Sequence, residues 1–342
     1  MLHIKYEYKN SILKNLQSTY MTKSINSGGQ IRWISSLRGL LVFLVFFSHL
    51  TALPIHKDLM FIIGRIGVAG FFLISGYLAV TSLEKRNSWQ FLMNRFFRIY
   101  PIYWLLLLIT FMLTDGYTVK ELLWNVTLFE EFAGYEAMIG SAWMLPIMVI
   151  FFVMLTVLKK HKNMLNILFY MTCAGSLVIG ALRFFTNMPF PTALCLLMCV
   201  GLIGYIQNKT RCIADKKFIS KIALFEITLI VASALSYADK VYWYFIAYNL
   251  GFAAYFLFQR FNVSIKIFDK LGELGFTFFL GAGIPMMLLG LFIDDLSYLN
   301  CYLYCIITFI LALLFSYIVT RWCEKPLLEW SKSFENIYKN KS

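Results

Sequence analysis

The sequence predicts an all-α, polytopic membrane protein with about ten transmembrane helices and both termini in the cytoplasm. Of its 342 residues, 60% are hydrophobic and 14% charged, and the mean hydropathy of +0.69 is too high for a water-soluble domain of this length. Apolar runs long enough to span a bilayer recur along the whole chain. Basic residues are concentrated in alternate connections between these runs, as in membrane proteins with a fixed orientation.

Ten apolar segments are predicted to cross the membrane, each close to the roughly 20 residues that a spanning helix needs. They are residues 35–54, 61–82, 99–114, 142–158, 164–181, 190–207, 221–237, 241–258, 275–293 and 299–319. Residues 1–33 are predicted to be a cytoplasmic segment, 34–328 the transmembrane domain and 329–342 a cytoplasmic tail. No small-residue cleavage site follows the first apolar run, so no cleavable secretory signal is expected.

The net charge of +13 does not indicate a nucleic-acid-binding protein, because the cations are confined to alternate loops. The basic stretches are residues 5–32, 85–98, 159–162, 209–221 and 260–270, and the tail after Arg321. The intervening loops, such as 115–136 and 294–295, are acidic or poor in cations. This alternation follows the positive-inside rule, and an even number of spans then places both termini in the cytoplasm.

The seven cysteines are expected to be inert packing residues, and no metal site is expected. Cys195 and Cys199, like Cys301 and Cys305, lie four residues apart on predicted spans. One helix face holds both members of each pair and forbids an intrahelical disulfide. No histidine completes a metal site beside them.

The first predicted span carries a cation near its cytoplasmic end and a histidine near its outer end. Ten residues separate Arg38 from His49, and only Gly39 and Ser48 among them are not apolar. Eleven helical steps rotate by about 1100°, so the two side chains fall within roughly 20° of one face, ~16 Å apart. An arginine at this depth costs roughly 2.5–3.5 kcal/mol and needs a partner or an aqueous cavity. The face therefore offers an anion-binding group and a general-base candidate, although a lone membrane histidine also serves as a structural hydrogen-bonding group.

Other arginines lie near the ends of predicted spans. Arg95 and Arg98 share one face where the third span begins, and two interpretations stay open for them. Their forked guanidinium groups suit phosphate binding, or they reach the lipid headgroups as positive-inside anchors. Arg65 and Arg183, near outer ends of spans, either line an outward cavity or meet lipid phosphate.

Five segments, in order over roughly residues 31–328, resemble the motifs of the membrane-bound acyltransferase 3 family. Arg38-Gly39 followed by His49 is similar to the family's arginine–ten residues–histidine signature. The other matches are residues 70–78 to "GxFFxxSGYL", residues 91–103 to the start of the third span with its paired arginines and Tyr-Pro, residues 125–129 with Trp143 and Leu145 to "NxxLF…WxLxxE", and residues 324–326 to the closing "EKP". Together the set is specific, whereas each motif alone is weak.

Three positions depart from the family pattern. Ser35-Ser36 stand where the family often has Asp-Gly. Met148 stands where a glutamate commonly follows Trp-x-Leu, and Ala282 replaces the histidine of the late "SYxxYLxH" motif. The N-terminal half of the site is thus intact while two later polar positions are lost, which bears on the acceptor and on activity.

The resemblance implies an O-acyltransferase of the bacterial inner membrane that holds no permanent cofactor and uses cytoplasmic acyl-CoA, most often acetyl-CoA, as donor. It implies transfer to a hydroxyl of a cell-surface polysaccharide, another envelope glycan or a lipid-linked saccharide, with membrane lipids as the surrounding partners. Arg95 and Arg98 are placed for the coenzyme A phosphates. Arg38, deeper on that side, would hold the donor or stabilise the thioester oxyanion. His49 would be a general base or an acyl carrier.

Small residues on the second span predict close helix packing. Gly70, Ser75 and Gly76 would let this span approach the first one closely, as small residues do between membrane helices. Packing alone is the simpler explanation of these three residues.

Three rival functions have to be distinguished from acyl transfer. A transporter or flippase of an envelope glycan would also have many spans, but half-chain repeats and interrupted helices are expected of it and are not evident in the sequence. A glycan polymerase or ligase would rely on a large outer loop, whereas residues 115–141 are few and acidic. An inactive family member would show lost polar positions such as Met148 and Ala282.

Overall fold

The computed structural model describes residues 32–50, 54–159, 164–188, 190–210, 215–292 and 301–331, and these ranges contain helices and no strand. The helices are α2 (Arg32–Ser48), α3 (Lys57–Lys85), α4 (Ser88–Leu113), α5 (Val119–Thr127), α6 (Leu145–Leu158), α7 (Met164–Thr186), α8 (Thr192–Thr210), α9 (Lys216–Ser236), α10 (Val241–Phe261), α11 (Lys266–Glu273), α12 (Gly275–Gly281), α13 (Gly283–Phe292) and α14 (Cys301–Val319). Short 3₁₀ turns are η1 (Glu131–Ala133), η2 (Gly140–Met144) and η3 (Ala238–Lys240), and α14 continues through the π-helical η5 (Thr320–Glu324). Most of the predicted terminal segments 1–33 and 329–342, and the basic residues 160–162, lie outside the described residues.

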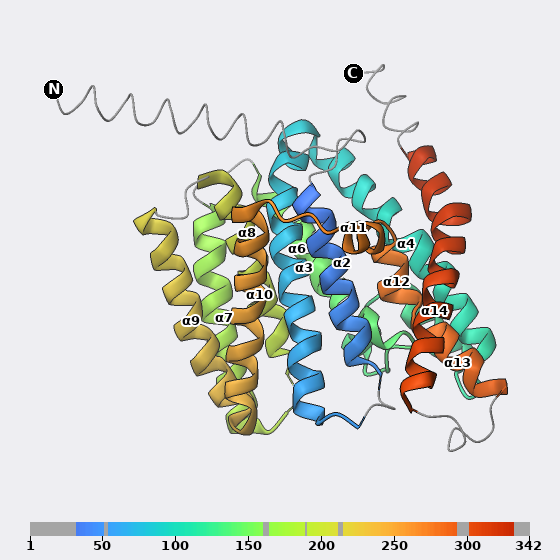
Figure 1. The fold of residues 1–342 in the computed structure, drawn as a ribbon. Helices are drawn as coiled ribbons and strands as arrows, with labels where there is room; N and C mark the ends of the chain where they lie inside the picture. Colours follow the sequence, from blue (N-terminus) through green and yellow to red (C-terminus); the bar gives the residue numbers. More distant parts are fainter. Residues whose placement is uncertain are drawn as a thin grey trace.

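The all-α polytopic architecture is confirmed. Eight helices of the described chain are long and apolar enough to cross a membrane, and a ninth is obtained if the bent pair that begins with α11 counts as one. The remaining predicted span, residues 35–54, corresponds to α2, whose 17 residues give a length of about 25 Å. The start of α2 and the end of α14 lie at the same face of the bundle, as an even number of crossings requires (Figure 1).

The bundle is centred on α2 and α3. On one side α3 packs against α8 and α10, with α7 and α9 beyond them, and on the other side α4, α12, α13 and α14 are grouped together (Figure 1). Large apolar side chains on α4, α7, α9, α10 and α14 face outward, as lipid-facing helices require. These two central helices thus carry Arg38, His49 and the small-residue motif, whereas Arg95 and Arg98 lie on α4.

The predicted packing of the small residues on α3 is right for one of them and wrong for another. Gly70 faces Leu41 of α2, as expected. Gly76 faces α8 instead, where an added Cβ would lie 1.8 Å from the Gly201 carbonyl oxygen, and Ser75 contacts Met148 of α6. Because successive helical positions point in different directions, one short motif brings three helices onto α3.

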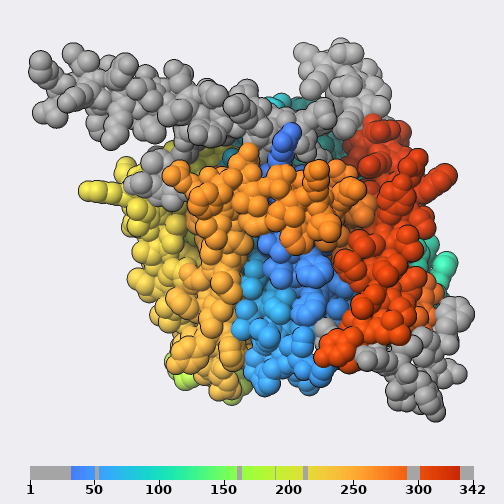
Figure 2. All heavy atoms as spheres, in the orientation of Figure 1, coloured from blue at the N-terminus to red at the C-terminus, as the bar shows by residue number. Residues whose placement is uncertain are grey.

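The chain bends sharply just before the ninth predicted span, residues 275–293. The short helix α11 and the following α12–α13 segment meet at an angle of 69°, and one residue, Ala282, separates the end of α12 from the start of α13 at Gly283. α11 is amphipathic and packs against α2. It crosses over the half of α2 that begins at Arg32 (Figures 1 and 2). The basic loop predicted at residues 260–270 therefore includes part of a helix that holds α2 in place.

The predicted outer loop 115–141 folds back into the bundle. At the end of α5, the backbone oxygens of Asn125 and Val126 accept hydrogen bonds from Tyr103 (2.7 Å) and Trp104 (2.9 Å) of α4. These partners lie near the middle of α4, a helix of 26 residues and about 39 Å. The amide of Asn125 is fully buried, donates to the carbonyls of Glu121 and Glu136, and accepts from the Met138 N–H. Asn125 thus fastens α5 to the segment around residues 136–138 that leads to η2.

Cysteine-accessibility labelling can test the orientation of the bundle. Because Asn125 is buried, the exposed residues Lys120, in the outer segment, and Lys216, at the start of α9, are better reporters. In a background without the seven native cysteines, an impermeant maleimide added outside intact cells is expected to label Lys120→Cys and to spare Lys216→Cys until the membrane is opened. The reverse pattern would show that the positive-inside assignment is wrong.

Candidate functional site

Arg38 lies near the middle of α2 and His49 just beyond its last residue, and α11 fixes the half of α2 that carries Arg38. The hydroxyl of Ser36 accepts a hydrogen bond from the Ile265 N–H (2.8 Å) and donates to the Asp269 carboxylate (2.5 Å), so it ties α2 to the start of α11. Gly39, beside Arg38, contacts the backbone of Phe268, where an added Cβ would lie 1.9 Å from the carbonyl oxygen. The serine that replaces the family's usual residue therefore docks a helix onto the arginine-bearing turn.

Arg38, Arg95 and Arg98 form a cationic cluster inside one half of the bundle. The positive charges of Arg38 and Arg98 are close enough to repel each other. The charge of Arg95 is repelled by those of Arg38, Arg98 and Arg86. Within the described residues no carboxylate oxygen lies within 4.0 Å of any of these three guanidinium groups. The structure thus brings together the three arginines that were predicted as site residues, in an arrangement that lacks a direct counter-ion among the described residues.

Arg95 is held by aromatic rings. Its guanidinium carbon lies 4.5 Å from the centroid of Phe152 on α6 and 5.1 Å from that of Phe91, one turn earlier on α4. Its Nε is buried and has no hydrogen-bond partner in the described part of the chain. A guanidinium placed against two rings inside the bundle does not have the geometry of an anchor that extends to the lipid headgroups.

The carboxylate of Glu324 interacts electrostatically with the arginine cluster. It is buried at the end of the π-helical η5, and one of its oxygens accepts hydrogen bonds from Thr277 of α12 (2.5 Å) and Thr320 (3.2 Å). Its charge interacts with those of Arg38 and Arg98. The wider turn of a π-helix, a feature often found at functional sites, places this carboxylate toward the arginines. Sequence reasoning noted the Glu-Lys-Pro motif but gave it no role.

His49 lies just beyond the last turn of α2, where its side chain is exposed. The backbone N–H of His49 donates a hydrogen bond to the carbonyl of Phe46 (3.0 Å), and the Ser48 hydroxyl donates one to the carbonyl of Val45 (2.7 Å). These two bonds satisfy carbonyl groups at the end of the helix. The histidine lines two cavities of about 580 and 290 Å³. The larger lies between the ends of α2 and α3 and also exposes Arg65, Ser141 and Trp143, whereas the smaller is lined mainly by α12, α13 and η2. His49 therefore belongs to the end of the bundle opposite the arginine cluster.

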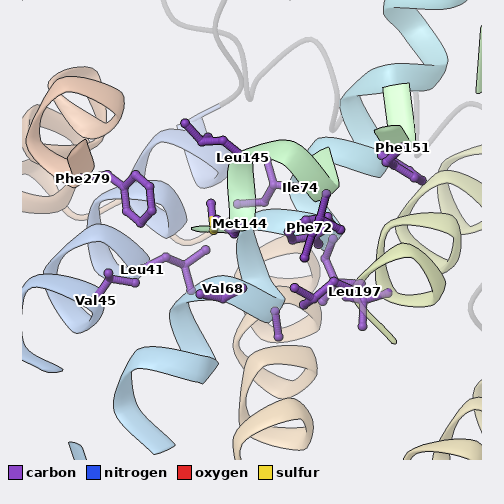
Figure 3. Close-up of a cluster of buried hydrophobic side chains, with 14 of the residues drawn as sticks. Leu41, Val45, Val68, Phe72, Ile74, Met144, Leu145, Phe151, Leu197 and Phe279 are labelled. Atoms are coloured by element: carbon purple, nitrogen blue, oxygen red, sulfur yellow. The ribbon is translucent and has the colours of Figure 1, made fainter. Parts of the chain in front are cut away.

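An apolar layer separates His49 from the arginine cluster. On the face of α2 between Arg38 and His49 lie Leu41 and Val45, one and two turns after Arg38. Both are buried and pack near Val68 of α3 and Phe279 of α12 (Figure 3). The two predicted halves of the site thus occupy different compartments of one helix bundle.

The two lost family positions lie in different surroundings. Ala282, in the break between α12 and α13, lines the smaller cavity together with His49. Met148 instead receives a long contact of 3.8 Å from the Ser75 hydroxyl, between α3 and α6. A histidine at position 282 would therefore face the same cavity as His49, while the cavities of this chain contain neither that imidazole nor a carboxylate at position 148.

The predicted outer loop, residues 115–141, contains a buried carboxyl group that was not among the predicted site residues. Glu130 is 1% exposed, and one of its oxygens has no hydrogen-bond partner in the described chain. Burial raises its pKa to about 6. A raised pKa means that the neutral form fits the fold better, so this group favours folding at acid pH and loses that contribution as the pH rises through 6.

In the described part of the chain, no group of three or more His, Cys, Asp or Glu side chains is arranged to hold a metal ion. The thiols of Cys173 and Cys199 lie 3.7 Å apart in the bundle core, away from both cavities.

Comparison with known families gives the chain its identity. The acyltransferase 3 family model, described as an acyltransferase domain, matches residues 31–321. The chain belongs to the acyltransferase 3 family. The match spans α2 to the start of η5 and so includes Arg38, His49, Arg95 and Arg98. No curated protein and no solved structure matches the chain. The protein is therefore a multi-pass membrane acyltransferase in its general class.

Proposed function

We propose that this protein transfers an acyl group, most often acetyl, from cytoplasmic acyl-CoA to a hydroxyl of a cell-surface polysaccharide or another envelope glycan. The observation that carries the proposal is the division of α2: its first half belongs to an arginine cluster that has no direct counter-ion among the described residues, and its other end meets a histidine-lined cavity. The positive-inside pattern assigns the arginine end to the cytoplasm, where acyl-CoA is made. A bacterial inner membrane is the setting that fits such a reaction.

The arginine cluster supports binding of the donor's phosphates. Coenzyme A carries several phosphate groups, and buried guanidinium groups bind phosphate through charge-assisted hydrogen bonds. Arg38 lies in the same cluster as Arg98, which favours donor binding over a separate oxyanion role for it. Glu324 is positioned to orient these guanidinium groups without neutralising them.

His49 supplies the proton chemistry in this proposal. As a general base, its neutral imidazole takes the proton of the acceptor hydroxyl while the hydroxyl oxygen attacks the thioester carbonyl. The carbon–sulfur bond then breaks, and the coenzyme A thiolate leaves and takes up a proton. As an acyl carrier, the same imidazole would first accept the acyl group and then pass it to the acceptor. In either route the acyl arm has to pass the layer at Leu41 and Val45.

Mass spectrometry of surface glycans tests the proposed function. Glycans from cells that make the protein are expected to carry acyl groups that are absent from otherwise identical cells without it, and isotopically labelled acetyl-CoA is expected to label them in everted membrane vesicles. A change in the amount of surface glycan with no change in its acylation would instead indicate a carrier. Unlabelled glycan in vesicles with the intact protein would indicate a family member that has lost its chemistry.

A further inference from the structure

The larger cavity beside His49 contains the cationic side chain of Arg65. From the sequence alone, Arg65 either lines an outward cavity or contacts lipid phosphate. Arg65 lies two turns into α3 and lines the cavity together with Lys57 and His49. The arginine therefore faces the space in which the proposed acceptor would bind. In contrast, Arg183, the other outer arginine, lines neither cavity and donates to the carbonyls of Ser236 (3.1 Å) and Phe190 (3.2 Å).

Three aromatic rings hold the Arg65 guanidinium. Its central carbon lies 4.5 Å from the centroid of Phe61, 4.7 Å from that of Tyr244 on α10, and 5.5 Å from that of Trp143 in η2. Two of these rings, Phe61 and Trp143, also line the cavity. Rings bind the faces of a guanidinium and leave its N–H groups, which lie in the plane, available to an acceptor.

The cavity offers no carboxylate to satisfy these donors. Among the residues that line it there is no Asp or Glu, and no described carboxylate oxygen lies within 4.0 Å of Arg65. The nearest acidic residue on this helix, Asp58, lies 3.3 Å from His56 instead. The cavity is thus cationic, with an oriented guanidinium and an ammonium.

We propose that the Arg65 cavity binds an acidic saccharide, so that the acceptor of this acyltransferase carries a carboxylate or phosphate group close to the hydroxyl that is acylated. Arg65 forms a bidentate pair with that anionic group, and Lys57 adds attraction at the cavity edge. The hydroxyl of the same sugar is then held near His49. This inference names the acceptor class and rests on the proposed acyl transfer, but the binding that it requires can be measured without turnover.

Ring-matched sugars test the inference. The intact protein in nanodiscs of zwitterionic lipid is titrated with methyl glucuronide, glucose 1-phosphate and the neutral methyl glucoside, with tryptophan fluorescence as the readout and Trp143→Phe as the assignment control. The two acidic sugars are expected to bind about tenfold or more tightly than the neutral sugar, as for a charge-assisted pair. Arg65→Gln should remove this preference, Arg65→Lys should restore part of it, and Arg183→Gln should leave it unchanged.

Several outcomes would overturn the inference. Equal binding of acidic and neutral sugars to the wild type, or an unchanged preference in Arg65→Gln, would show that the cavity does not select an anion. The protein would also be placed in nanodiscs that contain anionic phosphatidylglycerol. If this lipid inhibits binding of glucose 1-phosphate as strongly as added methyl glucuronide does, Arg65 would be assigned to lipid headgroups. Acetyl-CoA binding measured on the same samples separates the two proposals, because it should be unaffected in Arg65→Gln, and its absence from the wild type would count against acyl transfer itself.

Discussion

Replacing His49 with alanine is expected to lower acyl transfer by roughly 10²–10⁴-fold, the usual contribution of a general acid–base group. The protein should still fold and bind donor, because the imidazole is exposed at the end of α2 and lies apart from the arginine cluster. Turnover with labelled acetyl-CoA, thermal unfolding and donor affinity would be measured on the same preparation. His56→Ala is a matched control, since this second outer histidine pairs with Asp58 and lines neither cavity.

The same variant distinguishes the two possible roles of the imidazole. If His49 is an acyl carrier, wild-type protein incubated with labelled acetyl-CoA and no acceptor should retain label on the polypeptide, and His49→Ala should not. If it is a general base, neither protein should retain label. Combining His49→Ala with Arg38→Ala should cost less than the sum of the single losses, because residues that act in one reaction fail together. Near wild-type turnover by His49→Ala would refute either role.

The membrane architecture was predictable because hydropathy and loop charge are local properties of the sequence. The start of α2, the end of α14 and the positions of most spans follow from long apolar runs and from where lysine and arginine lie. The breaks were not predictable by this means. α11 is short and polar on one side, and the stop at Ala282 lies inside a long apolar segment, so an average over a window conceals both. Gly281, Gly283 and Pro285 around this stop are helix-breaking residues and are the signal that could have indicated it. Likewise, α5 reads as loop because its burial depends on partners in α4.

The candidate site was predictable only as separate motifs. Spacing along one helix indicated that Arg38 and His49 lie about three turns apart on α2, and the paired arginines indicated an anion site. That Arg38, Arg95 and Arg98 share one cluster depends on how α3 and α12 each pack against both α2 and α4, which no local pattern reveals. Glu324 joins them only through the π-helical turn at the far end of the chain. The aromatic cage of Arg65 draws on three separate elements and could not be read from the sequence.

Replacing Arg98 with alanine is expected to weaken acyl-CoA binding by roughly 1.5–3 kcal/mol, the worth of a hydrogen bond to a charged group. This corresponds to about a tenfold to hundredfold rise in the dissociation constant. Arg38→Ala should act in the same direction, because both guanidinium groups flank Glu324. Lysine at position 98 should recover only part of the loss, since an ammonium lacks the fork that matches phosphate. Isothermal titration with acetyl-CoA and with coenzyme A would measure these changes.

Arg95 and Arg321 sharpen the test of the donor site. Arg95→Ala should weaken donor binding and also destabilise the fold, because its guanidinium packs on Phe91 and Phe152. Arg321 is an exposed cation at the same end of the bundle, where it donates to the Tyr317 hydroxyl (3.0 Å), so Arg321→Ala should leave donor affinity unchanged. Unchanged affinity in the Arg95→Ala/Arg98→Ala double variant would show that these side chains are membrane anchors. The donor phosphates would then have to bind elsewhere, and the division of α2 into a donor end and an acceptor end would lose its main support.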